Sequence, residues 1–249
     1  LTSLIIPNSV TEIGNYAFSQ CTNLASLTFG ENSSLKTIGA AAFLGCSSLT
    51  SLNIPKSVTN IDGLFSDNDD LFSNNTNSSP FPDNTQLTIQ EGTQLTYFPS
   101  INHYYTNGKL TLNTDFTTTD GLIINNNNNA LLGVTSKNIT SANIPDNVTI
   151  IGDHTFEGCI SLTSVNIRNS VTSIGDFAFY QCTNLASVNI PNSVTTIGLR
   201  AFWKISIDNA NVTNITLVSG IKLTNFPDIN YYYTNEILTF NTNDFPTRD

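Results

Sequence analysis

The chain has 249 residues and a formal net charge of −10, yet only 11% of its residues are charged, against roughly 25% in a typical soluble domain. Lys and Arg together number only 9, which argues against a nucleic-acid groove or an anionic membrane surface as a partner, because both need clustered cations. No apolar run approaches the roughly 18 to 20 residues that span a bilayer, so we expect no direct membrane insertion of this segment.

One unit recurs along the chain with a period of 23 residues. The copies that align without gaps are 1–23, 139–161 and 162–184. Residues 24–48 hold the same unit with two extra residues around Gly30–Ser33, and the units that start at Leu49 and Leu185 lose their second half, which brings the count to six. A period of 20 to 29 residues with Leu at fixed positions predicts a solenoid, in which each coil buries its apolar face against its neighbours.

The unit at 162–184 predicts the structure of one coil. Its opening LTSVNI alternates apolar and short polar residues, which indicates a brief strand. Val171 and Ile174 form a second short inward pair before Gly175 ends the strand, and the spacing in DFAFYQC predicts a helical turn. We expect the six opening strands to form one continuous parallel sheet. We also expect a column of Phe rings through the core, formed by Phe18, Phe43, Phe156, Phe179 and Phe202.

A second motif, LTxFPxINxYYTN, shows that the chain is a duplicated super-unit, because residues 87–115 align with residues 215–243. The Leu spacing of its first copy is that of a degenerate coil, so we expect the solenoid to run through it; a separate small domain is the alternative. The predicted parts are a first repeat block, a connector with this module and an Asn-turn hairpin, a second repeat block, and a second module: 1–70, 71–138, 139–210 and 211–249. We expect the array to continue beyond both ends.

The phrase LTSVxIPxSVTxIGxxAFxxCxxL resembles the BspA-like leucine-rich repeat, a family of surface and secreted repeat proteins. It occurs at 1–24, 24–49, 139–162 and 162–185. The segment Asp120–Thr135 (DGLIINNNNNALLGVT) is similar to an element that often precedes repeat blocks in that family. The resemblance implies an α/β leucine-rich-repeat solenoid, built from coils with a short parallel strand, a second short strand and a helical turn. It also implies an extracellular or cell-surface location and a role in adhesion.

Four cysteines occupy the same position in four coils, so we expect a buried ladder of reduced thiols rather than metal ligands: Cys21, Cys46, Cys159 and Cys182. The two His residues, His103 and His154, have no partner motif for catalysis, and the sequence contains no nucleophile elbow, phosphate loop or HExxH. Glu residues never recur as a pair that a glycosidase would need. We therefore expect neither enzymatic activity nor a cofactor.

Two features stand out as candidate ligand sites. The DNDD segment offers Asp67, Asp69 and Asp70, hard oxygen ligands of the kind calcium takes; the alternative is a solvated loop, since the Gly and distant Glu of an EF-hand are missing. The aromatic runs hold Tyr97, Tyr104 and Tyr105, and in the second copy Tyr231, Tyr232 and Tyr233. Consecutive Tyr residues alternate faces on a strand, so we expect at least one in each run to be exposed, where it could stack on a sugar ring or pack on another protein. The alternative is that these rings close the solenoid core.

The motif N-x-S/T occurs seven times and marks candidate N-glycosylation sites: Asn32, Asn74, Asn77, Asn138, Asn147, Asn211 and Asn214. With so much Asn and Thr, some of these motifs arise by chance. Two functions remain open from the sequence. The first is adhesion to, or recognition of, extracellular proteins or glycans through the solenoid surface. The second is a structural element of an extracellular fibre or filament, which would assemble with itself end to end or laterally.

Overall fold

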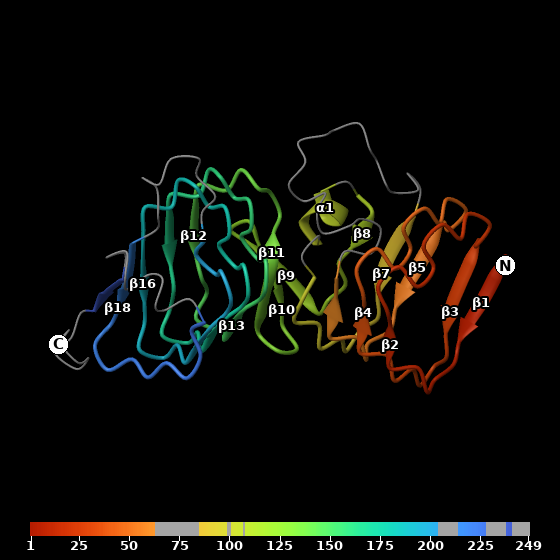
Figure 1. Ribbon diagram of the computed structural model, residues 1–249, viewed down its shortest axis with the longest axis horizontal. Coiled ribbons are helices and arrows are strands. Elements are labelled where there is room, and N and C mark those ends of the chain that lie inside the picture. The colour runs from red at the N-terminus through yellow and green to blue at the C-terminus, as the bar shows by residue number, and fades with distance from the viewer. Residues whose placement is uncertain (63–84, 99–100, 107, 204–213, 228–237, 241–249) are drawn as a thin grey trace. The chain divides into compact units, whose positions relative to one another are not determined.

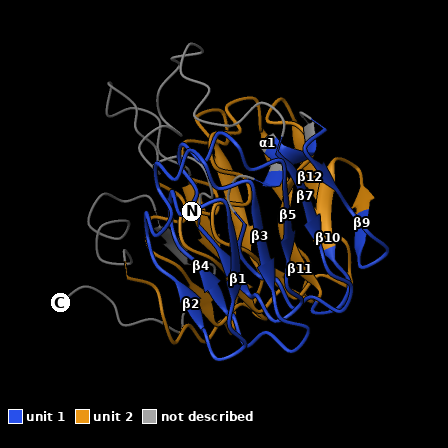
Figure 2. Cartoon of the chain, turned by 90° about the vertical axis from the view of Figure 1, so that its right-hand side faces the viewer, with its two compact units in different colours: residues 1–117, 125–128 blue, residues 118–124, 129–249 orange. Residues whose placement is uncertain are grey.

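The structure is a computed structural model that describes most of the chain (Figure 1): residues 1–62, 85–98, 101–106, 108–203, 214–227 and 238–240. Two compact units make up the chain (Figure 2). The first holds residues 1–117 and 125–128, and the second holds residues 118–124 and 129–249. These units are defined by packing, whereas the four parts expected from the sequence are defined by repeats, so that division stays a prediction.

The first unit stacks its coils through two series of parallel strands (Figure 1). The opening series consists of β1 (Ser3–Ile6), β3 (Ser26–Phe29), β5 (Ser51–Ile54), β7 (Gln86–Ile89) and β8 (Leu110–Thr111). The second series consists of β2 (Glu12–Ile13), β4 (Thr37–Ile38) and β6 (Asn60–Ile61). Since β7 pairs in parallel with both β5 and β8, the ladder runs through the first copy of the LTxFPxINxYYTN module.

The second unit repeats this arrangement. Its opening series consists of β12 (Ser141–Asn143), β14 (Ser164–Asn166), β16 (Ser187–Ile190), β18 (Asn214–Leu217) and β19 (Leu238–Phe240). A six-stranded sheet has the order β17-β15-β13-β11-β10-β9. Its members are β9 (Phe116–Thr119), β10 (Leu122–Asn125), β11 (Ala130–Val134), β13 (Ile150–Ile151), β15 (Ser173–Ile174) and β17 (Thr196–Ile197).

The 23-residue period appears directly in the strand register. Ser141 lies opposite Ser164, and Ile151 lies opposite Ile174. The expected single sheet of opening strands is nevertheless wrong, because these strands fall into four sheets: β1-β3, β5-β7-β8, β12-β14 and β16-β18-β19. The strands on either side of two interruptions, β3 with β5 and β14 with β16, still pack against each other without ladder pairing. Coil-on-coil stacking is therefore carried by the second series as well as by the opening series.

The segment expected to form a helical turn is instead a run of turns. Phe177 and Gln181 adopt left-handed φ angles of 53° and 58°, which no right-handed helix contains. The N–H groups of Phe177, Phe179 and Gln181 donate to the carbonyls of Leu199, Ala201 and Trp203 at 2.9, 2.7 and 3.0 Å. Because these N–H groups point along the solenoid to the next coil, they are not available for bonds within a helix. In the described part of the chain the one helix is α1 (Ile101–Thr106), so the fold is a β-solenoid rather than an α/β repeat.

Stacked apolar side chains fill the inside of each unit. The Phe column forms within both: the ring centroids of Phe18 and Phe43 are 5.5 Å apart, and Phe179 stacks on Phe156 and Phe202 at 4.9 and 5.1 Å. Inward residues of both strand series surround these rings, for example Val188 and Ile174. Burial of such side chains stabilises the coils by roughly 1.5 to 3 kcal/mol each.

Candidate functional site

The outward side chains of β3, β5, β7, β12, β14 and β16 form an uncharged polar surface in each unit, here named the strand face; on β1 the outward Ile5 is apolar and 71% exposed. The exposed members of the strand face are Ser26, Thr28, Ser51, Asn53, Gln86 and Thr88 in the first unit, and Ser141, Asn143, Ser164, Asn166, Ser187 and Asn189 in the second. Neighbours one coil apart bond to each other: Asn166 Nδ2 donates to Asn143 Oδ1 at 2.9 Å, and Thr88 Oγ1 donates to Asn53 Oδ1 at 3.1 Å. The strand face thus presents amides and hydroxyls at a regular spacing.

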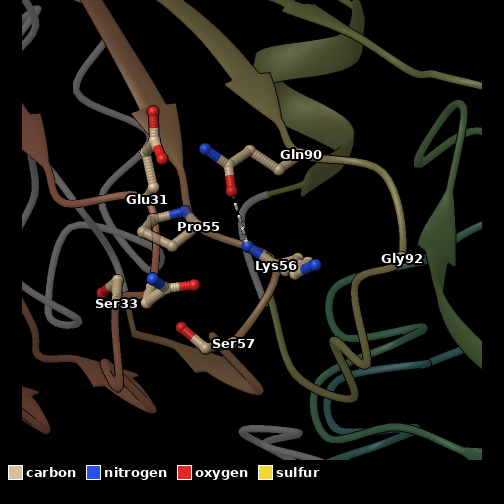
Figure 3. Close-up of a pocket in the computed structure, with 8 residues that line it drawn as sticks. Glu31, Ser33, Pro55, Lys56, Ser57, Gln90 and Gly92 are labelled. Carbon is tan, nitrogen blue, oxygen red and sulfur yellow. Dashed lines mark hydrogen bonds between the residues drawn. The ribbon is translucent and has the colours of Figure 1, made fainter. Parts of the chain in front are cut away.

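A recess of about 470 Å³ lies where the opening strands of the first unit end, here named the turn recess (Figure 3). It is lined by Glu31, Asn32, Ser33, Pro55, Lys56, Ser57, Gln90 and Gly92. One internal bond crosses it, from the Lys56 N–H to Gln90 Oε1 at 3.2 Å. Of these residues only Asn32 was a candidate from the sequence, as an N-glycosylation motif, although the two extra residues at Gly30–Ser33 were a signal that the coil is irregular there.

All four cysteines are free thiols, and three of them are fully buried: Cys46, Cys159 and Cys182. Burial raises the pKa of the Cys46 and Cys159 thiols to about 11. Cys182 Sγ donates to the Phe156 carbonyl at 3.1 Å. Thiols held protonated in this way are poor nucleophiles and poor metal ligands. Among the described residues no cluster of three or more His, Cys, Asp or Glu side chains is placed to hold a metal ion.

The first tyrosine run is not on a strand, so the alternation of faces expected for it does not apply. Tyr104 lies in α1, is 2% exposed and packs on Phe98 with ring centroids 5.3 Å apart. Tyr97 and Tyr105 are half-buried. This packing favours the alternative that the rings close the core. The second run, Tyr231 to Tyr233, lies outside the described residues.

The other candidates from the sequence divide by position. Asp67, Asp69, Asp70, Asn74, Asn77 and Asn211 lie outside the described residues, as does the side chain of His103. Asn32, Asn138 and Asn147 are exposed on turns, and Asn214 is the exposed first residue of β18. His154 Nδ1 contacts Glu157 Oε2, and the imidazole stacks on Phe177 at 4.9 Å, which indicates a packing residue.

The family model for the BspA type leucine rich repeat region matches residues 1–103 and 134–246, with six copies. The chain belongs to this family. The match covers the second copy of LTxFPxINxYYTN completely and enters the first copy, where it ends at residue 103, so it reaches beyond the parts in which the repeat is most regular. No curated protein sequence matches this BspA-type repeat protein. In the described part of the chain, none of the helical structure has the length and apolar character needed to cross a bilayer.

Similar solved structures include three bacterial proteins. The pneumococcal vaccine antigen PcpA is 24% identical over 91% of this chain and 47% of its own, with a TM-score of 0.44. A leucine-rich repeat protein from Eubacterium ventriosum is 18% identical over 80% of this chain and 56% of its own, with a TM-score of 0.40. A leucine rich cell surface protein from Faecalibacterium prausnitzii is 22% identical over 98% and 80%, with a TM-score of 0.39. The BspA-type chain spans about half the length of the first two, and the family assignment rests on the repeat match alone.

Proposed function

We propose that this BspA-type repeat protein is a non-enzymatic extracellular protein that recognises proteins or glycans through its solenoid surface. The observation that carries the proposal is the strand face, where the exposed outward residues of β3, β5, β7, β12, β14 and β16 are polar and uncharged. Such a surface offers hydrogen bonds without requiring an oppositely charged partner. Each hydrogen bond contributes about 0.5–1.5 kcal/mol, so binding depends on engaging many of them at once.

The regular spacing supports partners that are themselves extended. Asn143 and Asn166 repeat at 23 residues in sequence and lie on paired strands, β12 and β14, so that equivalent groups recur along the solenoid. Adjacent strands lie about 4.8 Å apart. An extended peptide or an oligosaccharide laid along the solenoid would meet the same amide or hydroxyl at each coil, and the gain from several weak contacts accumulates within one binding event.

Two of the solved relatives support a surface location, because one is described as a vaccine antigen and another as a cell surface protein. Catalysis is not part of the proposal. Burial raises the pKa values of the Cys46 and Cys159 thiols to about 11, so these two thiols are poor nucleophiles at neutral pH.

The test is a binding assay of the chain on a panel of immobilised extracellular-matrix proteins and glycans, read by biolayer interferometry. Asn189→Arg places a long cation on the strand face, and Asn192→Arg places the same side chain on an exposed turn. We expect Asn189→Arg to weaken binding about tenfold or more, since one lost hydrogen bond and a steric block cost about 1.4 kcal/mol or more. Equal affinities for both variants would show that the strand face is not the binding surface.

A structural role in an extracellular fibre is the second candidate. The observation in its favour is the duplication, since residues 87–115 align with residues 215–243 and a tandem array of such super-units would be an elongated stalk. Light scattering and negative-stain imaging separate the two functions. Filaments much longer than one chain at micromolar concentration favour the fibre, whereas a monodisperse monomer that binds the panel leaves recognition as the function.

A further inference from the structure

Consecutive coils of the first unit differ in the length of the turn that follows the opening strand. After β3 the turn has five residues, 30–34, before the next inward residue, Leu35. After β7 the turn also has five residues, 90–94, before the inward Leu95. After β5 the turn has only three residues, 55–57, before the inward Val58. The Val58 N–H closes this turn by donating a hydrogen bond of 3.1 Å to the Pro55 carbonyl. A short turn therefore lies between two long ones.

The second unit lacks this difference in turn length over four consecutive coils. The corresponding three-residue turns are 145–147, 168–170, 191–193 and 218–220. Each is closed by the same hydrogen bond, with lengths of 3.1, 3.1, 3.1 and 3.3 Å. Turns of equal length end level with one another, whereas the long turns on either side of Pro55–Ser57 extend past it. The turn recess is thus a consequence of the two-residue insertions.

Polar groups without internal partners converge on the recess. Ser57 Oγ is buried and has no hydrogen-bond partner, and neither Glu31 nor Lys56 forms an ion pair within the described part of the chain. In the second unit, by contrast, the charges of neighbouring turns approach each other, with Arg168 Nε 3.6 Å from Asp146 Oδ1. Ser170 Oγ in the second unit is likewise buried and without a hydrogen-bond partner among the described residues, so the recess is distinguished by the combination of Ser57 with Glu31, Lys56 and the two long turns.

The lining supplies donors and acceptors in nearly equal measure. Glu31 accepts, Lys56 donates, and Ser57 does both; the amides of Asn32 and Gln90 also do both. Figure 3 shows the Pro55–Ser57 turn between Glu31 and Ser33 on one side and Gln90 and Gly92 on the other. Pro55 also belongs to the lining, with its ring largely buried.

We propose that the turn recess binds one sugar residue of a glycan, an inference that rests on the recognition function proposed above. Each sugar hydroxyl is both a donor and an acceptor, which fits this mixed lining. An anion would meet Glu31, and an apolar ligand would leave Ser57, Asn32 and Gln90 unpaired. The volume of about 470 Å³ falls within the roughly 300–1,000 Å³ typical of small-ligand sites.

The test is a saturation-transfer NMR titration of the full chain with free monosaccharides: glucose, galactose, mannose, fucose and N-acetylglucosamine. Ser57→Ala removes the unpaired hydroxyl from the recess. Ser170→Ala is the matched control, because Ser170 occupies the same coil position with the same buried, unpartnered Oγ, but beside turns of equal length. We expect at least one sugar to bind, Ser57→Ala to weaken it about two- to tenfold and Ser170→Ala to leave it unchanged.

A deletion gives a second and independent readout. Removal of Glu31 and Asn32 shortens the turn after β3 to the length found after β5, so monosaccharide binding should disappear. The proposal is overturned if sugar binding survives this deletion, if Ser57→Ala leaves sugar binding unaltered, or if none of the five sugars binds. It is also overturned if the chain binds glycine and none of the sugars.

Failure here is distinguishable from failure of the proposed function. If the deletion variant binds immobilised proteins or glycans with undiminished affinity, the recognition function is supported and the sugar site is not. If the chain binds a free monosaccharide in a Ser57-dependent way but binds nothing on the immobilised panel, the sugar site is supported and the recognition function is not.

Discussion

The side-chain amide of Asn125 donates a hydrogen bond to the main-chain carbonyl of Leu95 at 3.0 Å, across 30 residues of sequence. The same amide donates to the Thr93 carbonyl at 3.2 Å, and Asn125 is fully buried. Asn127 and Asn128 add bonds of 2.9 Å to the carbonyls of Thr93 and Gln94. Residues 93–95 belong to no strand, so the Asn side chains supply the donors that a neighbouring strand would otherwise supply.

Asn125→Asp tests this role with almost no change in side-chain volume. The carboxylate cannot donate and would face two carbonyl oxygens in a buried site, so we expect the free energy of unfolding to fall by about 2–4 kcal/mol. Asn126→Asp is the control: Asn126 is exposed and bonds Thr117 Oγ1, a hydroxyl that can turn and donate to a carboxylate. Urea unfolding at pH 7 measures both variants. Losses of equal size would show that the Asn125 amide has no special role.

The sequence predicted the repeats better than it predicted the connections between them. The alternation in LTSVNI, the inward pair Val171 and Ile174, and the stacking of Phe rings follow from apolar periodicity, which depends on burial alone; all three appear in the structure, with the Phe rings stacked within each unit. The helical turn was wrong, because the spacing of Phe177 to Cys182 is also satisfied by turns whose N–H groups reach the next coil. Periodicity shows which residues are buried and does not show where backbone donors point.

The candidate sites were harder to predict for a related reason. A pair such as Asn125 and Leu95 depends on which of five identical Asn residues points inward, and identical residues carry no signal for that choice. The turn recess depends on a difference in length between neighbouring coils, seen only when turns 30–34, 55–57 and 90–94 are compared as neighbours in space. The tyrosine runs were candidate binding residues because of their residue type, yet Tyr104 is a core residue.

Gly175 lies where one coil closely approaches the backbone of the preceding coil. A Cβ at this position would lie 2.5 Å from the Asp153 nitrogen and 2.7 Å from the Gly152 carbonyl carbon. We expect Gly175→Ala to destabilise the chain by about 1–3 kcal/mol or more, since the clash is with backbone atoms that cannot move independently. Gly14 has the same place in the first coil, and a Cβ added there would meet no heavy atom within 4 Å. Gly14→Ala should therefore be near neutral in the same thermal melt, and a comparable loss there would contradict the close-approach argument.

Stability should fall at alkaline pH through the buried thiols. Burial raises the pKa of Cys159 from 9.0 to about 11, so below pH 9 the thiol is protonated in both states. Between pH 9 and 11 the Cys159 thiol ionises in the unfolded chain and stays protonated in the folded chain. At pH 11 this difference lowers the free energy of unfolding by about 2–3 kcal/mol. Burial also raises the pKa of Tyr180, and this acts in the same direction. Urea unfolding at several pH values in this range should show that the free energy of unfolding declines less steeply with pH for Cys159→Ala than for the unaltered chain. Equal slopes for the two chains would contradict the role of the Cys159 thiol.

Phe179 should be the most sensitive ring of the Phe column in the second unit, because it stacks on both neighbours, Phe156 at 4.9 Å and Phe202 at 5.1 Å, and is 1% exposed. Phe179→Ala removes both stacks and leaves a cavity inside the coil, so we expect a loss of about 3–5 kcal/mol in the free energy of unfolding. Phe18 provides the comparison, since it is half-buried and stacks on Phe43 at 5.5 Å. Phe18→Ala should cost clearly less in the same urea titration, because solvent already covers part of the ring and less apolar surface is exposed on truncation. A larger loss at Phe18 than at Phe179 would show that stacking along the solenoid does not determine the stability of the coils.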